Sequence, residues 1–419
     1  MSEAVAPIDL TTADPDSVPL DQIDMSQAAL FQTNTFGPYF ERLRREDPVH
    51  YTPDSFFGPY WSITRFDDIV YVDKHHELFS SADGITLADR QQDFATVNFI
   101  AMDPPTHDDQ RKAVQGVVAP RNLAKMESLI RGRVADILDS LPVGETFDWV
   151  DRVSIELTTQ MLATLFDFPF EERRKLTYWS DMATSGELAG GPTPEPVRRE
   201  ALMECLEAFT AIWHERASQP PGESVDLISM LAHGEDTKDM LDRPMEYLGN
   251  LILLIVGGND TTRNSITGGV VALNQNPGEY EKLRRQPGLI PNMVAEIIRW
   301  QTPLAYMRRT ATQDTELGGK QIRKGDKVVM WYVSGNRDET AIDRPDEFII
   351  DRPNARHHLS FGFGIHRCMG NRLAEMQLRI VWEEILKRFH TVEAVGEPVR
   401  VQSSFVKGYS ELPVRLHSV

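Results

Sequence analysis

Cys368 lies in the stretch "HLSFGFGIHRCMGNRLAEMQL" (358–378), among glycines, aromatic residues and bases. The glycines favour turns and close backbone approach, whereas Ala374, Leu378 and Val381 begin an apolar stripe at helical spacing. We therefore expect Cys368 to lie just before a helix N-terminus. Free N–H groups and the helix dipole stabilise a thiolate at such a position.

Three other roles compete for this thiol. A lone cysteine is most often a buried core residue, and Cys368 also has His366 two residues away as a base for nucleophilic catalysis. Residues this close on one tight loop rarely set up base catalysis, and no third orienting group is visible. Zinc is disfavoured because Cys205 is remote. A cysteinate held by a glycine-rich loop also suits an axial haem ligand.

A second constellation lies in "IPNMVAEIIRWQTP" (290–303), which reads as a short helix delimited by prolines. Glu296 and Arg299 are three residues apart and share one face of that helix. Such a pair is usually a solvated salt bridge that contributes little. The neighbouring Ile297 and Ile298 favour instead a buried pair that needs a further partner.

The segment "YLGNLILLIVGGNDTTRNSITGGVVAL" (247–273) has helical periodicity but contains Gly257-Gly258. One interpretation ends the helix at these glycines and restarts it with Asn259 or Asp260 as N-cap. The other is a single long buried helix, distorted where something packs against its backbone. In that case Asp260 and Thr261 would place a carboxylate and a hydroxyl at the distortion, as a proton relay.

His107 and Arg111 form an i, i+4 pair that opens a helix after Pro104-Pro105. An isolated pair of this kind is most often a solvated helical face. The alternative is that the two cations grip an anion.

These residues must be positioned by a mainly helical chain. Helical periodicity covers residues 121–141, 151–166, 170–184, 196–218, 243–275, 277–285 and 291–301. Strand and turn signals are confined to 49–72, 316–333 and 399–416. The Gly- and Pro-rich segment 185–196 predicts a mobile connector or lid between two helices. The predicted fold class is mainly α with small peripheral β-sheets.

Composition limits the functional classes. The net charge of −19 argues against nucleic acid or an anionic membrane as the main partner. The apolar run 251–256 is far too short to span a membrane, and no signal peptide opens the chain, so we expect no membrane span and a cytoplasmic location. Residues 1–25 carry six acids and no Lys or Arg. This predicts an extended acidic arm over 1–34, followed by one domain over 35–419.

Taken together, the four motifs resemble the cytochrome P-450 superfamily. "FGFGIHRCMGNRLA" (361–374) matches the haem-binding loop F-x-x-G-x-x-x-C-x-G, and "EIIR" matches the E-x-x-R helix. "GGNDTT" matches the oxygen-activation stretch of the long central helix, and "HDDQR" matches the helix that binds a haem propionate. Their order and spacing fit from about residue 35 to 419. Longer segments of this sequence around the motifs are similar to those of the bacterial soluble terminal alkane and fatty-acid hydroxylases.

The resemblance implies a role for each matching position. The fold would be that of a cytochrome P-450, with a long central helix over haem b. Cys368 would be the thiolate ligand to the haem iron, which is the only metal expected. Four residues would bind the haem propionates, namely His107, Arg111, Arg309 and His366. Glu296, Arg299 and Arg352 would form a structural ion triad, and Asp260 with Thr261 would be the acid–alcohol pair that delivers protons to oxygen.

The resemblance also implies a substrate pocket and partners. The pocket would be lined by Leu253, Val256, Gly257, Leu304, Ala305, Met307, Phe405 and Val406. The expected activity is hydroxylation of unactivated C–H bonds, at the terminal carbon of medium-chain alkanes or fatty acids, with O2 and electrons from a ferredoxin and its reductase. Arg367 and Arg372 are candidates for the ferredoxin contact. Alternatives are a terpene or steroid substrate, a peroxide-driven peroxygenase, and a non-catalytic haem sensor.

Overall fold

In the computed structural model, which describes residues 8–222 and 226–418, the central element is helix α10 (Pro244–Gln275). It runs without a break through Gly257 and Gly258, so a single long helix is confirmed and a restart at Asn259 or Asp260 is wrong. A Cβ at Gly258 would lie 2.7 Å from a methyl of Leu162, whereas one at Gly257 would meet open space. Glycine therefore lets α6 (Glu156–Phe166) pack closely against α10.

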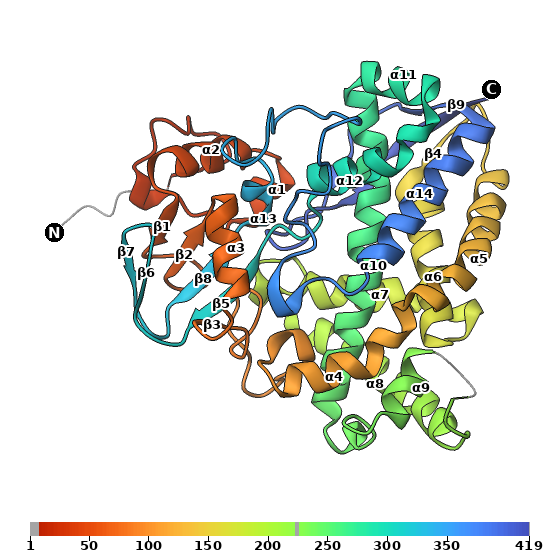
Figure 1. Ribbon diagram of the computed structural model, residues 1–419, viewed down its shortest axis with the longest axis horizontal. Coiled ribbons are helices and arrows are strands. Elements are labelled where there is room, and N and C mark those ends of the chain that lie inside the picture. The colour runs from red at the N-terminus through yellow and green to blue at the C-terminus, as the bar shows by residue number, and fades with distance from the viewer. Residues whose placement is uncertain (1–7, 223–225, 419) are drawn as a thin grey trace.

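Several helices pack around α10, which is buried along most of its length. Those in contact with it include α7 (Arg174–Thr184), α8 (Glu195–Ala217), α11 (Pro277–Arg285), α12 (Ile290–Gln301) and α14 (Asn371–Arg388). The remaining helices are α1 (Ala28–Gln32), α2 (Gly37–Glu46), α3 (Phe66–Lys74), α4 (Thr106–Gln115), α5 (Pro120–Asp139), α9 (Leu227–His233) and α13 (Tyr332–Gly335). Helices α1, α2 and α3 lie apart from α10, beside the largest sheet (Figure 1). Short 3₁₀ or π turns cover Leu20–Gln22, Phe99–Ala101, Gly116–Val118, Val150–Ile155, Phe170–Glu172, Glu187–Ala189, Met240–Asp242, Pro287–Leu289 and Gly364–His366.

The largest sheet lies to one side of the helices, near the N-terminus (Figure 1). Its strand order is β1 (Val49–Thr52), β2 (Tyr60–Ile63), β8 (Lys327–Met330), β5 (Met307–Ala311) and β3 (Phe79–Ser80). Only the β2–β8 pair of this sheet is parallel, with Trp61 opposite Val328. Three smaller sheets pair β4 (Thr146–Asp148) and β9 (Phe389–Ala394) with β12 (Pro413–Ser418), β6 (Thr315–Leu317) with β7 (Lys320–Ile322), and β10 (Val399–Arg400) with β11 (Tyr409–Glu411).

The predicted fold class, mainly α with small peripheral sheets, is confirmed. One expected sheet segment is partly helical: residues 49–63 form the β1–β2 hairpin, but α3 occupies 66–74. Phe66, Ile69 and Val72 recur at helical spacing and are buried on one face of α3, which the aromatic and β-branched composition had masked. Among the described helices, none combines the length and the apolar character needed to cross a lipid bilayer.

The expectation of an extended N-terminal arm is wrong for residues 8–34, whereas residues 1–7 lie outside the described part. Leu10, Val18 and Ile23 are buried, in one apolar cluster with residues of α2 and with Trp331. Arg42 donates to the Val18 carbonyl at 2.6 Å, which satisfies an arm carbonyl from α2. Burial of these apolar side chains thus holds an acidic segment against the domain. The assignment of residues 35–419 to one domain stays a prediction.

Candidate active site

The cysteine loop joins the sheet region to α14. Gly364 has φ of +65°, and a Cβ there would lie 2.2 Å from the Asp73 carbonyl oxygen. Glycine is therefore required for the loop to pass the end of α3. The Cys368 amide donates to the Phe361 carbonyl at 2.8 Å, and α14 begins three residues later at Asn371, as expected.

The Cys368 thiol faces an interior cavity. Burial raises the pKa of this thiol, while the N–H groups of Gly370 and Asn371 and the charges of Arg111 and Arg367 oppose that rise. The same N–H groups and cations would stabilise a thiolate, as required of an anionic metal ligand.

The cavity encloses about 460 Å³ beside α10 and is mainly apolar. Of the expected pocket residues, Leu253, Val256, Gly257, Leu304, Met307 and Phe405 line it. Ala305 and Val406 do not. Ala305 is buried in the cluster that contains Trp331, and Val406 pairs with Leu304 as an isolated bridge. In an extended segment, successive side chains point to opposite sides, so one neighbour of each lining residue is turned away.

Further lining residues come from segments that carried no functional motif. They include Ile85, Phe94, Phe99 and Ile100 from the chain before α4, Leu162 from α6, and Leu188 from the connection between α7 and α8. Irregular loops have no hydrophobic period, so only the apolar character of "NFIA" (98–101) could have pointed to them. The 185–194 connection thus forms part of the cavity wall, whereas its predicted mobility stays a prediction.

Four basic residues gather at the Cys368 end of the cavity. Arg111, Arg309 and His366 line it, and His107 lies directly behind, with its ring centroid 4.4 Å from that of His366. His107 Nε2 and His366 Nδ1 are buried without a hydrogen-bond partner among the described residues. Burial, Arg309 and His107 lower the pKa of His366 to about 2, so its ring is neutral.

An unsatisfied buried polar atom is costly, and an acceptor placed between these two nitrogens would remove that cost. Within the described residues Arg111 donates only to the Arg367 carbonyl, at 2.6 Å, and Arg309 pairs with Asp73 at 2.8 Å. Two imidazoles and two guanidinium groups provide the donors that a pair of carboxylates would take. With the thiol at the same end, the residues fit a haem group.

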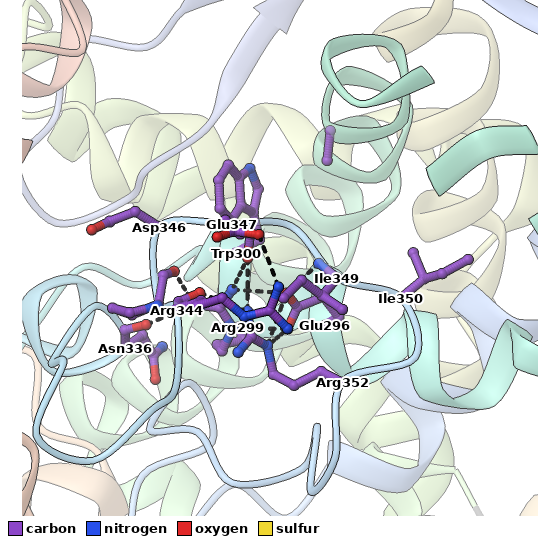
Figure 2. A network of polar contacts seen from close by, with 12 residues as sticks. Glu296, Arg299, Trp300, Asn336, Arg344, Asp346, Glu347, Ile349, Ile350 and Arg352 are labelled. Carbon is purple, nitrogen blue, oxygen red and sulfur yellow. Dashed lines mark hydrogen bonds and ion pairs between the residues drawn. The ribbon is translucent and has the colours of Figure 1, made fainter. Parts of the chain in front are cut away.

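The expected ion triad is assembled and buried (Figure 2). Glu296 accepts from Arg299 at 2.8 Å and pairs with Arg352 at 3.1 Å. Arg299 also donates to the carbonyls of Asn336 and Pro345, both at 2.8 Å. The triad thereby joins α12 to the chain that leads into the cysteine loop. The further partner that the apolar surroundings of Glu296 required is Arg352.

Asp260 and Thr261 point in different directions from α10. Thr261 lines the cavity, and its hydroxyl donates to the Gly257 carbonyl at 2.8 Å. Asp260 is fully buried on the side of α7 and pairs with Arg263 at 2.8 Å. Arg263 in turn contacts Asp181 at 2.5 Å. Burial raises the pKa of Asp260 to about 6 although Arg263 opposes it. The structure therefore brings Thr261, but not Asp260, to the cavity.

An interior cavity that combines one thiol with several basic side chains able to donate to carboxylates is the arrangement that a cysteine-ligated haem protein requires. Known proteins resemble this chain over nearly all of its length. The sequence profile of the cytochrome P450 family matches residues 288–408. Linalool 8-monooxygenase of Pseudomonas putida is 35% identical, over 95% of this chain and 99% of the relative. Methyl-branched lipid omega-hydroxylase of Mycobacterium tuberculosis is 32% identical over 90% of both proteins.

Solved structures agree with these sequence relatives. Cytochrome P450-153 from Novosphingobium aromaticivorans is 47% identical, with a TM-score of 0.89 over 94% of this chain and 99% of that chain. CYP153D17 from Sphingomonas sp. is 49% identical, with a TM-score of 0.89 over 95% and 100%. The chain belongs to the cytochrome P450 family. It is a monooxygenase that binds haem b and takes O2, a hydrophobic substrate and electrons from a redox partner.

Proposed function

We propose that the protein hydroxylates the terminal carbon of medium-chain alkanes or fatty acids. The supporting observation is the wall of the cavity, where Leu253, Val256, Leu304, Met307 and Phe405 offer apolar contacts to a hydrocarbon chain. The relative named as a methyl-branched lipid omega-hydroxylase is consistent with that choice.

The residues at the inner end of the cavity would hold the cofactor. Cys368 is the proposed thiolate ligand, and His107, Arg111, Arg309 and His366 are the proposed partners of the haem carboxylates. When bound, haem would supply the chemistry that activates O2 for insertion into an unactivated C–H bond. One oxygen atom enters the substrate as a hydroxyl, and the other leaves as water after the uptake of two electrons and two protons.

Thr261 and Asp260 are the proposed proton-transfer residues. The Thr261 hydroxyl lies on the cavity wall and can hold and pass on a proton there. Asp260 would supply it from behind the helix, since its raised pKa lets it carry a proton near neutral pH. Glu296, Arg299 and Arg352 are proposed to act structurally, by holding the cysteine loop in place.

The electron donor is proposed to be a ferredoxin. Arg367 and Arg372 are exposed on the cysteine loop and at the start of α14, and neither forms an ion pair with a described carboxylate. Two unpaired cations beside the ligand loop are suited to an acidic protein that approaches from this side.

A second candidate is oxidation of a terpene, which the linalool 8-monooxygenase relative favours. The deciding experiment supplies the haem-loaded protein with ferredoxin, its reductase and NAD(P)H. Separate reactions receive a medium-chain alkane, the fatty acid of equal length and linalool. The proposal predicts terminal alcohols from the first two. Product from linalool alone would assign the terpene, and product with peroxide alone would replace the ferredoxin route.

A further inference from the structure

Four arginines among the described residues line the cavity, and they differ in how their charge is balanced. Arg198 pairs with Glu195 at 3.0 Å, and Arg309 pairs with Asp73 at 2.8 Å. Arg90 and Arg111 form no ion pair with any carboxylate in the described ranges. Burial lowers the pKa of both guanidinium groups, so each would be stabilised by an anion brought from outside.

Arg111 is already accounted for, because it lies with His107, Arg309 and His366 at the proposed haem carboxylates. Those four side chains offer more than enough donors for two carboxylates. Arg90 remains, and its single hydrogen bond within the described chain goes to the Ala101 carbonyl at 3.0 Å.

The charges around Arg90 do not neutralise it. Asp83 favours its charged form and Arg308 opposes it, and among the described residues neither forms an ion pair or hydrogen bond with it. Asp89, the adjacent carboxylate, forms ion pairs with Arg308 at 2.9 Å and with Lys327 at 2.8 Å. A half-buried guanidinium is thus left beside an apolar cavity, which is unfavourable unless a ligand supplies the missing charge.

The other polar groups nearby are engaged elsewhere. Gln91 accepts from Arg199, and Arg199 also pairs with Asp93 at 2.7 Å and with Glu195 at 2.9 Å. These bonds tie the loop that carries Arg90 to the start of α8. They fix the loop without using the Arg90 charge, so the Arg90 donors that are not bonded to Ala101 stay available for a ligand in the cavity.

We propose that Arg90 binds the carboxylate of a fatty-acid substrate and directs its hydrocarbon chain towards Cys368. The inference rests on the proposed function and narrows it, because it selects acids over alkanes of the same length. A guanidinium binds a carboxylate through paired charge-assisted hydrogen bonds, and the apolar wall receives the remainder of the chain.

The test measures dissociation constants of the haem-loaded protein from substrate-induced changes in its absorption spectrum. The ligands are dodecanoic acid, the primary alcohol of that length and the n-alkane. Arg90→Gln should weaken binding of the acid by about tenfold or more and leave the alcohol and the alkane unchanged. Arg90→Lys should restore part of the acid affinity. Arg198→Gln is the matched control, since Glu195 already balances that charge, and it should not discriminate against the acid.

Three results would overturn the assignment of Arg90. They are an unchanged affinity for the acid, an equal loss for all three ligands, and a lower haem content with the ligand preference intact. The last would make Arg90 a haem-carboxylate partner instead. Because binding is measured without turnover, failure of the proposed terminal hydroxylation would show separately, in the products of the unchanged protein.

Discussion

The imidazole rings of His107 and His366 lie edge to face with centroids 4.4 Å apart, and each keeps one buried nitrogen without a partner in the described part of the chain. His107 comes from the first turn of α4, and His366 precedes the cysteine by two residues. The contact therefore joins two distant segments at the point where a haem carboxylate would be received.

His107→Ala and His366→Ala should each accelerate haem loss. Each removes one donor to a carboxylate, a contribution of about 1.5–3 kcal/mol for a hydrogen bond to a charged group. The measurement is transfer of haem to an excess of a haem-binding apoprotein. His390→Ala, on the exposed face of β9, serves as the control. Haem loss as slow as in the unchanged protein, in both variants, would contradict the assignment.

Glu296→Gln should destabilise the fold by about 3–5 kcal/mol, because Arg299 and Arg352 would be left buried without their carboxylate. Urea unfolding of the haem-loaded protein, followed by circular dichroism, measures the change. Removing one partner of the exposed Glu235–Lys238 pair should leave the midpoint unchanged. A similarly small effect at Glu296 would show that the triad is not structural.

The free energy of unfolding should depend on pH in a way that reflects the titration of Asp260. Its folded pKa of about 6 lies above the ordinary value of 3.8, so the native state binds more protons between these limits. Stability from this group is therefore lost as pH rises from about 4 to 6. The unfolding midpoint of Asp260→Asn relative to the unchanged protein should increase across that window and level off above it. A constant difference would place the Asp260 pKa in its ordinary range.

Thr261→Ala should leave haem binding intact and divert electrons from product to hydrogen peroxide. The hydroxyl lies on the cavity wall, and its loss removes a proton carrier without opening the packed face of α10. Product formed per NAD(P)H consumed should fall by about tenfold or more. Thr261→Ser keeps the hydroxyl and should retain most of the yield. Full coupling in Thr261→Ala would exclude a relay through this side chain.

The placement of Cys368 just before α14 and the burial of the Glu296–Arg299 pair were predictable from the sequence because short motifs determine both. Cys368, its glycine loop and the Glu296–Arg299 pair each combine a reactive or charged residue with a spacing that few other structures need. The continuity of α10 was not predictable, since two glycines permit both a break and a close approach. The close approach of Leu162 to Gly258, which is visible only in three dimensions, accounts for the glycine within an unbroken helix.

The cavity wall was only partly predictable. Leu304 and Met307 line it, but Ala305 between them is turned into the core, and composition does not say which neighbour faces inwards. Arg90 lies in an irregular segment without periodicity, and its significance comes from the partners that it lacks in three dimensions. The expectation of an extended N-terminal arm was wrong for a similar reason, because the acidic residues masked the buried Leu10, Val18 and Ile23.

The most direct test concerns Cys368 as the thiolate ligand of haem. The reduced protein is exposed to carbon monoxide, and its absorption spectrum is compared between the unchanged chain, Cys368→Ala and Cys205→Ala, normalised to haem content. Cys205 is buried in the helical core, where burial raises the pKa of its thiol, so its removal should keep the thiolate-type band. Cys368→Ala should lose that band. An unchanged spectrum in Cys368→Ala would contradict the ligand assignment.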